Sequence, residues 1–120
     1  MTTGEEEFIH EERGCRMKVA YNANYGGFEL SDKAVLYLCQ LKGISVEEYD
    51  YRWYAGDWVD YENRADPDLI ATIEVLGEEA GKYGSILKIR EIPDGSEFDI
   101  AEYDGLEMVV YGDEEWPDLR

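Results

Sequence analysis

Two short turn sequences near the C-terminal end constrain the fold of this 120-residue chain more than any other feature. Pro93-Asp94-Gly95 and Tyr103-Asp104-Gly105 consist of residues that favour reverse turns, and each has apolar segments on both sides. Strands separated by such short turns are expected to run antiparallel. The spacing predicts strands over 85–92, 97–100 and 106–111.

A further strand is predicted near the N-terminal end. Residues 16–22 alternate so that Met17, Val19 and Tyr21 fall on one face, which is the pattern of a half-buried strand. The glycines of the following loop mark its end. A β-hairpin is also predicted over residues 44–62, with its turn at Ala55-Gly56-Asp57.

The first of two predicted helices covers residues 32–42. Ser31 can cap its first turn, and Gly43 is placed to end it. Its apolar side chains recur at three- and four-residue spacing and are expected to face the sheet. They are Ala34, Val35, Leu38 and Leu41.

The second predicted helix opens at residues 66–68. Asp66 can cap it, and Pro67 suits the first helical position because its missing N–H needs no partner there. Gly81 and Gly84 are predicted to end this helix. Its apolar stripe is Leu69, Ile73, Leu76 and Ala80.

This order of elements predicts an α+β fold, in which a mostly antiparallel sheet carries two helices packed on one face. We expect a single domain over residues 16–111, between a flexible acidic leader (1–15) and a frayed acidic tail (112–120). The sequence leaves the oligomeric state open.

Several kinds of chemistry lack their usual residues. The single histidine, His10, lies in the predicted leader, so no histidine relay is expected in the domain. Cys15 and Cys39 form no C-x-x-C pair, and their thiols suit a reducing compartment. No window is long and apolar enough to span a membrane, and no signal peptide is recognisable. We therefore expect a cytoplasmic protein without a cofactor.

The most unusual property of the sequence is its charge. The formal net charge is −18, which disfavours direct binding to nucleic acid or to anionic membranes. Residues 1–43 carry 7 acidic and 5 basic residues, whereas residues 44–120 carry 22 acidic and 6 basic residues. Rows of carboxylates there could imitate the charge density of DNA for a basic groove.

Aromatic residues alternate with these acids over residues 47–62. Tyrosine and tryptophan are favoured anchors of protein interfaces; the alternative is that the aromatic face completes the core. The predicted partner-binding residues are Glu47, Glu48, Asp50, Asp57, Asp60, Glu62, Asp66, Asp68, Tyr51, Trp53, Tyr54, Trp58, Glu97, Asp99, Glu102 and Asp104.

Three parts of the sequence carry a resemblance. They are residues 18–31, which contain Tyr25-Gly26-Gly27-Phe28-Glu29-Leu30-Ser31, residues 64–79 and residues 87–105. Together they resemble a family of small uncharacterised phage and bacterial proteins. The resemblance implies a phage-related origin. No activity is established for that family, so it assigns no catalytic residue here.

Three functions are compatible with these features. The favoured one is a non-enzymatic acidic inhibitor that mimics nucleic acid and binds the basic surface of a host defence or DNA-processing protein. The second is a protein that sequesters a small nucleotide at the loop Tyr25, Gly26, Gly27 and Phe28, provided that Arg52, Arg64, Lys88 or Arg90 converge on it. The third is a carboxylate-metal hydrolase.

Overall fold

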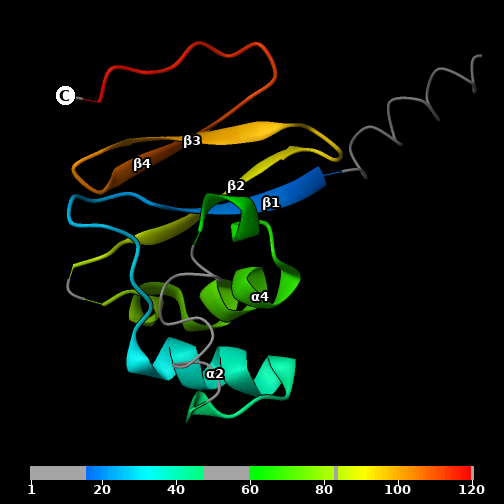
Figure 1. Ribbon diagram of the computed structural model, residues 1–120, viewed down its shortest axis with the longest axis vertical. Helices are drawn as coiled ribbons and strands as arrows, with labels where there is room; N and C mark the ends of the chain where they lie inside the picture. The colour runs from blue at the N-terminus through cyan, green and yellow to red at the C-terminus, as the bar shows by residue number, and fades with distance from the viewer. Residues whose placement is uncertain (1–15, 48–59, 83, 120) are drawn as a thin grey trace, which may run out of the picture.

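The computed structural model describes residues 16–47, 60–82 and 84–119. Its strands form two antiparallel pairs, β1 with β2 and β3 with β4. Both α-helices lie on one side of the β1–β2 pair, and β3–β4 lies on the other (Figure 1). The elements are β1 (Arg16–Asn22), α2 (Asp32–Lys42), η1 (Tyr61–Asn63), α4 (Pro67–Leu76), η2 (Gly77–Ala80), β2 (Leu87–Pro93), β3 (Phe98–Tyr103) and β4 (Leu106–Tyr111).

The predicted α+β class is therefore confirmed, with two strand pairs among the described residues where one sheet was expected. The difference arises at the connection between β2 and β3. Its residues 94–97 include Gly95 with a φ of 82°, and the chain there crosses from one pair to the other instead of forming a hairpin.

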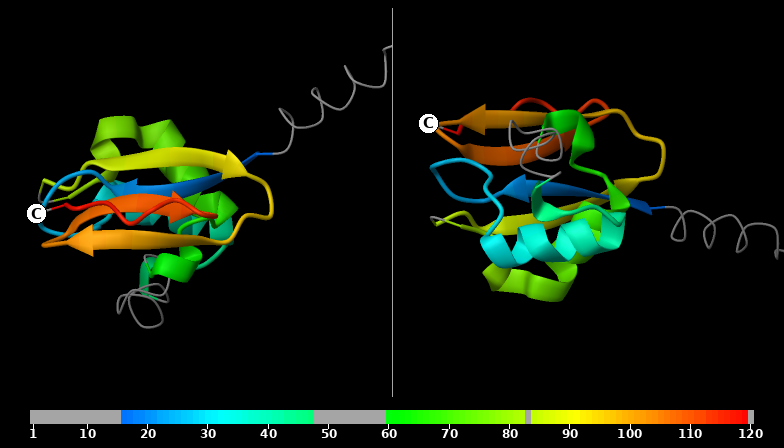
Figure 2. Two further views of the ribbon diagram at one scale, coloured as in Figure 1. Left: turned by 90° about the horizontal axis from the view of Figure 1, so that it is seen from above. Right: turned by 60° about the horizontal axis from the view of Figure 1, so that its bottom comes forward.

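Strand β1 is central to this arrangement. Seen from above, β2 lies beside β1, and the β3–β4 pair lies in front of them (Figure 2, left). Successive side chains of a strand point to opposite faces, and here both faces are covered, since Val19 and Ala20 are each 0% exposed. The predicted face of Met17, Val19 and Tyr21 packs against the second strand pair, and Ala20 packs towards the helices.

Two hydrophobic cores follow from this layering. The larger lies between the helices and the β1–β2 pair, and it includes Cys39; Cys15 lies outside the described residues. The smaller lies between the two strand pairs. Its buried members are Val19, Ile92, Ile100 and Val109.

The ends of α2 match the sequence prediction. The hydroxyl of Ser31 accepts a hydrogen bond from the amide of Ala34 (3.1 Å), and Gly43 adopts the left-handed conformation with a φ of 71°. One predicted contact is wrong: Leu41 is 41% exposed. Helix α2 packs mainly on helix α4 and not on the sheet. A helix covers a narrower surface than a sheet does, so fewer apolar side chains of α2 are buried.

Helix α4 begins as predicted but ends earlier. Asp66 accepts a hydrogen bond from the amide of Leu69 (3.0 Å), and Pro67 occupies the first helical position. The helix stops at Leu76 because Gly77 has a φ of 58°. The stretch from Gly77 to Ala80 is a separate 3₁₀ helix, so the predicted end at Gly81 or Gly84 is wrong.

The strand predictions differ in accuracy. β1 and β4 have the predicted bounds, β2 is displaced by one or two residues, and β3 extends beyond its predicted end at Ile100 to Tyr103. The predicted hairpin over 44–62 is wrong at both described ends. Val46 and Glu47 are helical, and Tyr61–Asn63 form η1. Its middle, residues 48–59, lies outside the described residues.

The turn between β3 and β4 is a tight hairpin. Asp104 and Gly105 both have positive φ angles, 54° and 90°, which suits the right-handed twist of a two-residue hairpin. No helix in the described part of the chain is long and apolar enough to cross a lipid bilayer.

Candidate functional site

A buried ion pair joins η1 to the β3–β4 hairpin. The guanidinium of Arg64 donates two hydrogen bonds to the carboxylate of Glu107, at 2.6 and 3.0 Å. The two side chains are only 3% and 4% exposed. Breaking such a pair leaves a charge stranded in a medium of low dielectric constant, so the pair fixes these two segments relative to each other.

The same arginine covers the edge of β1. The amide of Ala20 donates to the carbonyl of Arg64 (2.8 Å), and the amide of Asn22 donates to Glu107 (2.8 Å). The guanidinium also lies over the ring of Phe28, 4.0 Å from its centroid, in a cation–π contact. β1 therefore pairs with β2 along one edge and with these groups along the other.

Asn22 is a second buried polar group at this junction, with 0% exposure. Its side-chain nitrogen lies 2.7–2.9 Å from the carbonyls of Asn24, Gly27 and Gly105. Its side-chain oxygen accepts from the amide of Ile86 (2.9 Å). Asn22 thereby fixes the loop after β1 against the β3–β4 turn.

Exposed carboxylates surround the ion pair. Asp60 and Glu62 are exposed beside Tyr61, and Glu102 lies opposite Glu107 in the β3–β4 register. The pKa of Tyr61 is raised, first by partial burial and then by the charges of Glu102 and Glu107. Predicted partner-binding acids from two distant parts of the sequence, Asp60 and Glu62 in one and Glu102 in the other, thus meet at Tyr61.

Other predicted partner-binding residues lie elsewhere. Asp66 and Asp68 contact the ammonium of Lys42 at 3.1 and 2.9 Å, so this ammonium balances one of their two negative charges. Glu97 and Asp99 lie at the opposite end of β3 from Glu102, and Asp104 and Glu47 are exposed. Outside the described residues are Glu48, Asp50, Tyr51, Trp53, Tyr54, Asp57 and Trp58.

The described basic side chains are largely engaged with carboxylates. Ion pairs involve Lys18, Lys33, Lys42, Arg64, Lys82 and Arg90. The acids around Tyr61 are not among the carboxylates of these pairs, apart from Glu107. The surface there consequently presents negative charge that the described lysines and arginines do not balance.

The glycine loop considered for a nucleotide is explained by packing. Gly26 and Gly27 have φ angles of 101° and 108°. The amide of Gly26 donates to the carbonyl of Asp104 (2.9 Å), and Gly27 accepts from the hydroxyl of Ser85 (2.6 Å). A Cβ at Gly105 would collide with the backbone of both loop glycines. These contacts account for the loop without a ligand.

Of the cations proposed for that loop, Arg64, Lys88 and Arg90 are described, and they do not gather there with their charge exposed. Arg64 reaches Phe28 but is buried against Glu107. Arg90 donates to both carboxylate oxygens of Glu114, at 2.9 and 2.7 Å. Lys88 is exposed on β2, and Arg52 lies outside the described residues.

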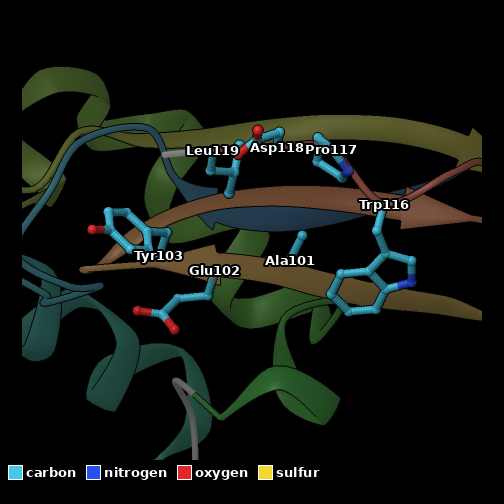
Figure 3. A pocket seen from close by; sticks show the side chains of 7 residues that line it. All are labelled: Ala101, Glu102, Tyr103, Trp116, Pro117, Asp118 and Leu119. Atoms are coloured by element: carbon cyan, nitrogen blue, oxygen red, sulfur yellow. The ribbon is translucent and has the colours of Figure 1, made fainter.

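Sequence reasoning missed a hollow beside β3. It has a volume of about 380 Å³ and is lined by both β3 and the C-terminal segment (Figure 3). Trp116, at 61% exposure, and Tyr103, at 45%, lie on either side of Ala101. The residues between β4 and Trp116 show no sequence pattern from which the position of Trp116 beside β3 could have been predicted.

Residues 16–47, 60–82 and 84–119 contain no group of three or more histidine, cysteine, aspartate or glutamate residues placed to hold a metal ion. No protein-family model, curated protein or solved structure matches the chain. The phage-related resemblance therefore stays a prediction.

Proposed function

We propose that this protein binds the cationic nucleic-acid-binding surface of a host defence or DNA-processing protein and blocks it without catalysing a reaction. The observation that carries the proposal is the meeting at Tyr61 of acids from two distant parts of the sequence. Asp60 and Glu62 line a shallow hollow together with Tyr61 and Arg64. The charge of Glu102, which is far away in the sequence, acts on Tyr61 at the same place. The buried Arg64–Glu107 pair lies beneath these groups.

The arrangement suits a rigid anionic ligand. A basic groove binds DNA largely through contacts with phosphates, and carboxylates held on a fixed backbone supply negative charge at a low cost in conformational entropy. The buried ion pair and the bonds of Asn22 hold that backbone. Such a surface also steers a cationic partner toward it over long range.

The test starts from capture by the immobilised protein. Host lysate is passed over the column, bound proteins are eluted with a salt gradient, and each is then assayed on a DNA duplex. We expect a captured protein to release the duplex when the acidic chain is added, and the competition to weaken as salt is raised. A captured protein that keeps its duplex contradicts the proposal.

Charge reversal locates the surface. The double variant Asp60→Lys, Glu62→Lys should lose affinity by about tenfold or more at low salt. The matched control, Glu78→Lys with Asp94→Lys, changes the net charge equally at exposed positions in η2 and the β2–β3 connection. Equal losses in both variants would mean that net charge alone drives binding, and would overturn the assignment of this surface.

A further inference from the structure

We infer that the free edge of β2 binds an extended segment of a partner protein, which adds an antiparallel strand with a basic residue opposite Glu91 and an acidic residue opposite Lys88. β2 is hydrogen-bonded to β1 along one edge, and no described strand lies beside the other (Figure 2, left). Unpaired main-chain groups at a sheet edge are a template for another chain, and peptide-binding domains use them in this way. The acidic residues at Tyr61 lie at the opposite edge of this strand pair, where Arg64 bonds to β1, so the two surfaces can act independently.

The strand register identifies the residues of β2 that point outward. In an antiparallel pair, opposite residues exchange both main-chain hydrogen bonds or none, in alternation. The amide of Ala20 donates away from β2, to the carbonyl of Arg64 (2.8 Å). Its partner in the register, Ile89, therefore directs both its N–H and its C=O to the free edge, and by alternation so do Leu87 and Glu91. In the described part of the chain, no hydrogen bond reaches the main-chain groups of these three residues at that edge.

A hollow borders this edge at the start of β2. Its volume is about 660 Å³, within the usual range for ligand sites of roughly 300–1,000 Å³. The lining includes Gly77 and Glu78 of η2 and residues 84–88, and Ile86 offers an apolar side chain that is 46% exposed. An added strand that runs past Ile89 toward the start of β2 reaches this hollow, where an apolar side chain of the partner can be buried.

The exposed charges of the edge select the chemistry of the partner segment. Glu91 lies opposite Lys18, whose ammonium is hydrogen-bonded to Glu74 of α4, so Glu91 is on the helix side. The charge of Glu91 acts on that ammonium without a hydrogen bond. Lys88 is on the other face, with Ile92 of the second core. Neither Glu91 nor Lys88 forms an ion pair with another described residue.

Opposite charges that face each other on neighbouring strands are stabilising, and like charges are destabilising. A partner strand therefore pairs best when a basic residue lies opposite Glu91 and an acidic residue lies opposite Lys88. In an antiparallel strand the acidic residue comes three positions after the basic one.

A second copy of this chain fits the same edge poorly. Antiparallel pairing of β2 with its own copy, centred on Lys88, Arg90 or Glu91, would place that residue opposite itself. Centring on Ile89 would place Lys88 opposite Arg90 of the second copy. Each register brings like charges together, and each chain carries a net charge of −18.

Hydrogen exchange of the full chain tests the edge before any ligand is added. We expect the amides of Ile89 and Glu91 to exchange quickly and those of Lys88 and Arg90, which bond to β1, to exchange slowly. Protection of Ile89 equal to that of Arg90 would mean that the edge is already covered. Protection of Ile89 that rises with protein concentration would assign the edge to a second copy. Either result would overturn the inference.

The probe is a peptide with blocked ends and the sequence Ser-Lys-Thr-Val-Glu-Val-Ser, which has no net charge. In the inferred register its lysine lies opposite Glu91, its first valine opposite Ile89 and its glutamate opposite Lys88. We expect saturable chemical-shift changes along β2 in nuclear magnetic resonance spectra, and slower exchange at Ile89 and Glu91. Absence of saturable changes at about 1 mM peptide contradicts the inference.

Methylation of single peptide nitrogens tests whether the peptide binds as a strand. The N–H of the first valine faces Ile89, so its N-methylation should lower the affinity about tenfold or more. The matched control is N-methylation of the threonine, whose N–H points away from β2, and it should change the affinity less than about twofold. Equal losses from the two methyl groups would rule out antiparallel pairing in this register.

Charge exchange tests the chemistry assigned to the partner. Glu91→Lys should weaken binding of the peptide about threefold or more, and a peptide with glutamate in place of its lysine should regain that affinity. The matched control, Asp99→Lys, makes the same change in net charge at an exposed position of β3 and should bind the original peptide like the parent. If the exchanged peptide binds Glu91→Lys no better than the original does, the assignment of a basic residue opposite Glu91 is wrong.

Discussion

Arg64 is the residue on which the candidate site depends most. Its replacement by glutamine leaves Glu107 buried, unpaired and directly opposite Glu102 in the hairpin register. We expect the free energy of unfolding to fall by about 3–5 kcal/mol, as for other broken buried pairs. Urea denaturation measures the loss.

A second arginine provides the control. Arg90→Gln removes an ion pair whose side chains are 35% and 38% exposed, and exposed pairs contribute roughly 0–1 kcal/mol. A similar loss for both arginine variants would contradict the structural role assigned to Arg64.

The pKa of Tyr61 is a measure of the negative electrostatic potential around the Arg64–Glu107 pair. Because Glu102 contributes to its raised pKa, Glu102→Gln should lower the pKa of Tyr61 in a resonance titration. Because the pKa of Tyr61 is higher in the folded state than the unfolded value of about 10, its contribution to stability is fully present at pH values below about 10. The contribution is lost as the pH rises through the folded-state pKa of Tyr61. An unchanged titration in Glu102→Gln would show that the charge of Glu102 does not act on Tyr61.

Among the elements, the β3–β4 turn packs closely against the loop after β1. Gly105 has a φ of 90°, and a Cβ there would collide with the backbone of Gly26 and Gly27. Gly95 has a φ of 82° but open space around it. Gly95→Ala should cost about 1–2 kcal/mol from backbone strain alone, and Gly105→Ala roughly 1–3 kcal/mol more from overpacking.

Thermal or urea unfolding of the two alanine variants tests this difference. Loop resonances of residues 24–28 should move in Gly105→Ala and stay in place in Gly95→Ala. If both variants lose the same stability, the close approach of the two loops contributes nothing beyond the positive φ.

The elements also show which features the sequence could predict. Ser31, Gly43 and Asp66 act within one helical turn, so their roles follow from local chemistry. The pairing of Arg64 with Glu107 joins residues 43 positions apart, and no local pattern encodes it. The acidity of 47–68 is visible in the sequence, but the ion pairs of Asp66 and Asp68 with Lys42 depend on how α2 packs against α4.

At the scale of the whole molecule, the net charge of −18 should oppose compactness. Added salt screens repulsion between the exposed carboxylates. We therefore expect the midpoint of thermal unfolding to rise between about 0.01 and 0.15 M sodium chloride, where the Debye length shortens from roughly 30 to 8 Å. A fall in the midpoint would mean that the ion pairs outweigh the repulsion.

Because both faces of β1 are buried, in two different cores, its order of synthesis has a consequence for folding. β1 is the first of the described elements, yet its hydrogen-bonded partner β2 and the strands over its second face are the last of them. A ribosome that has released residues only as far as η2 offers β1 neither of them. The native packing of β1 must therefore wait until β2, β3 and β4 have been synthesised.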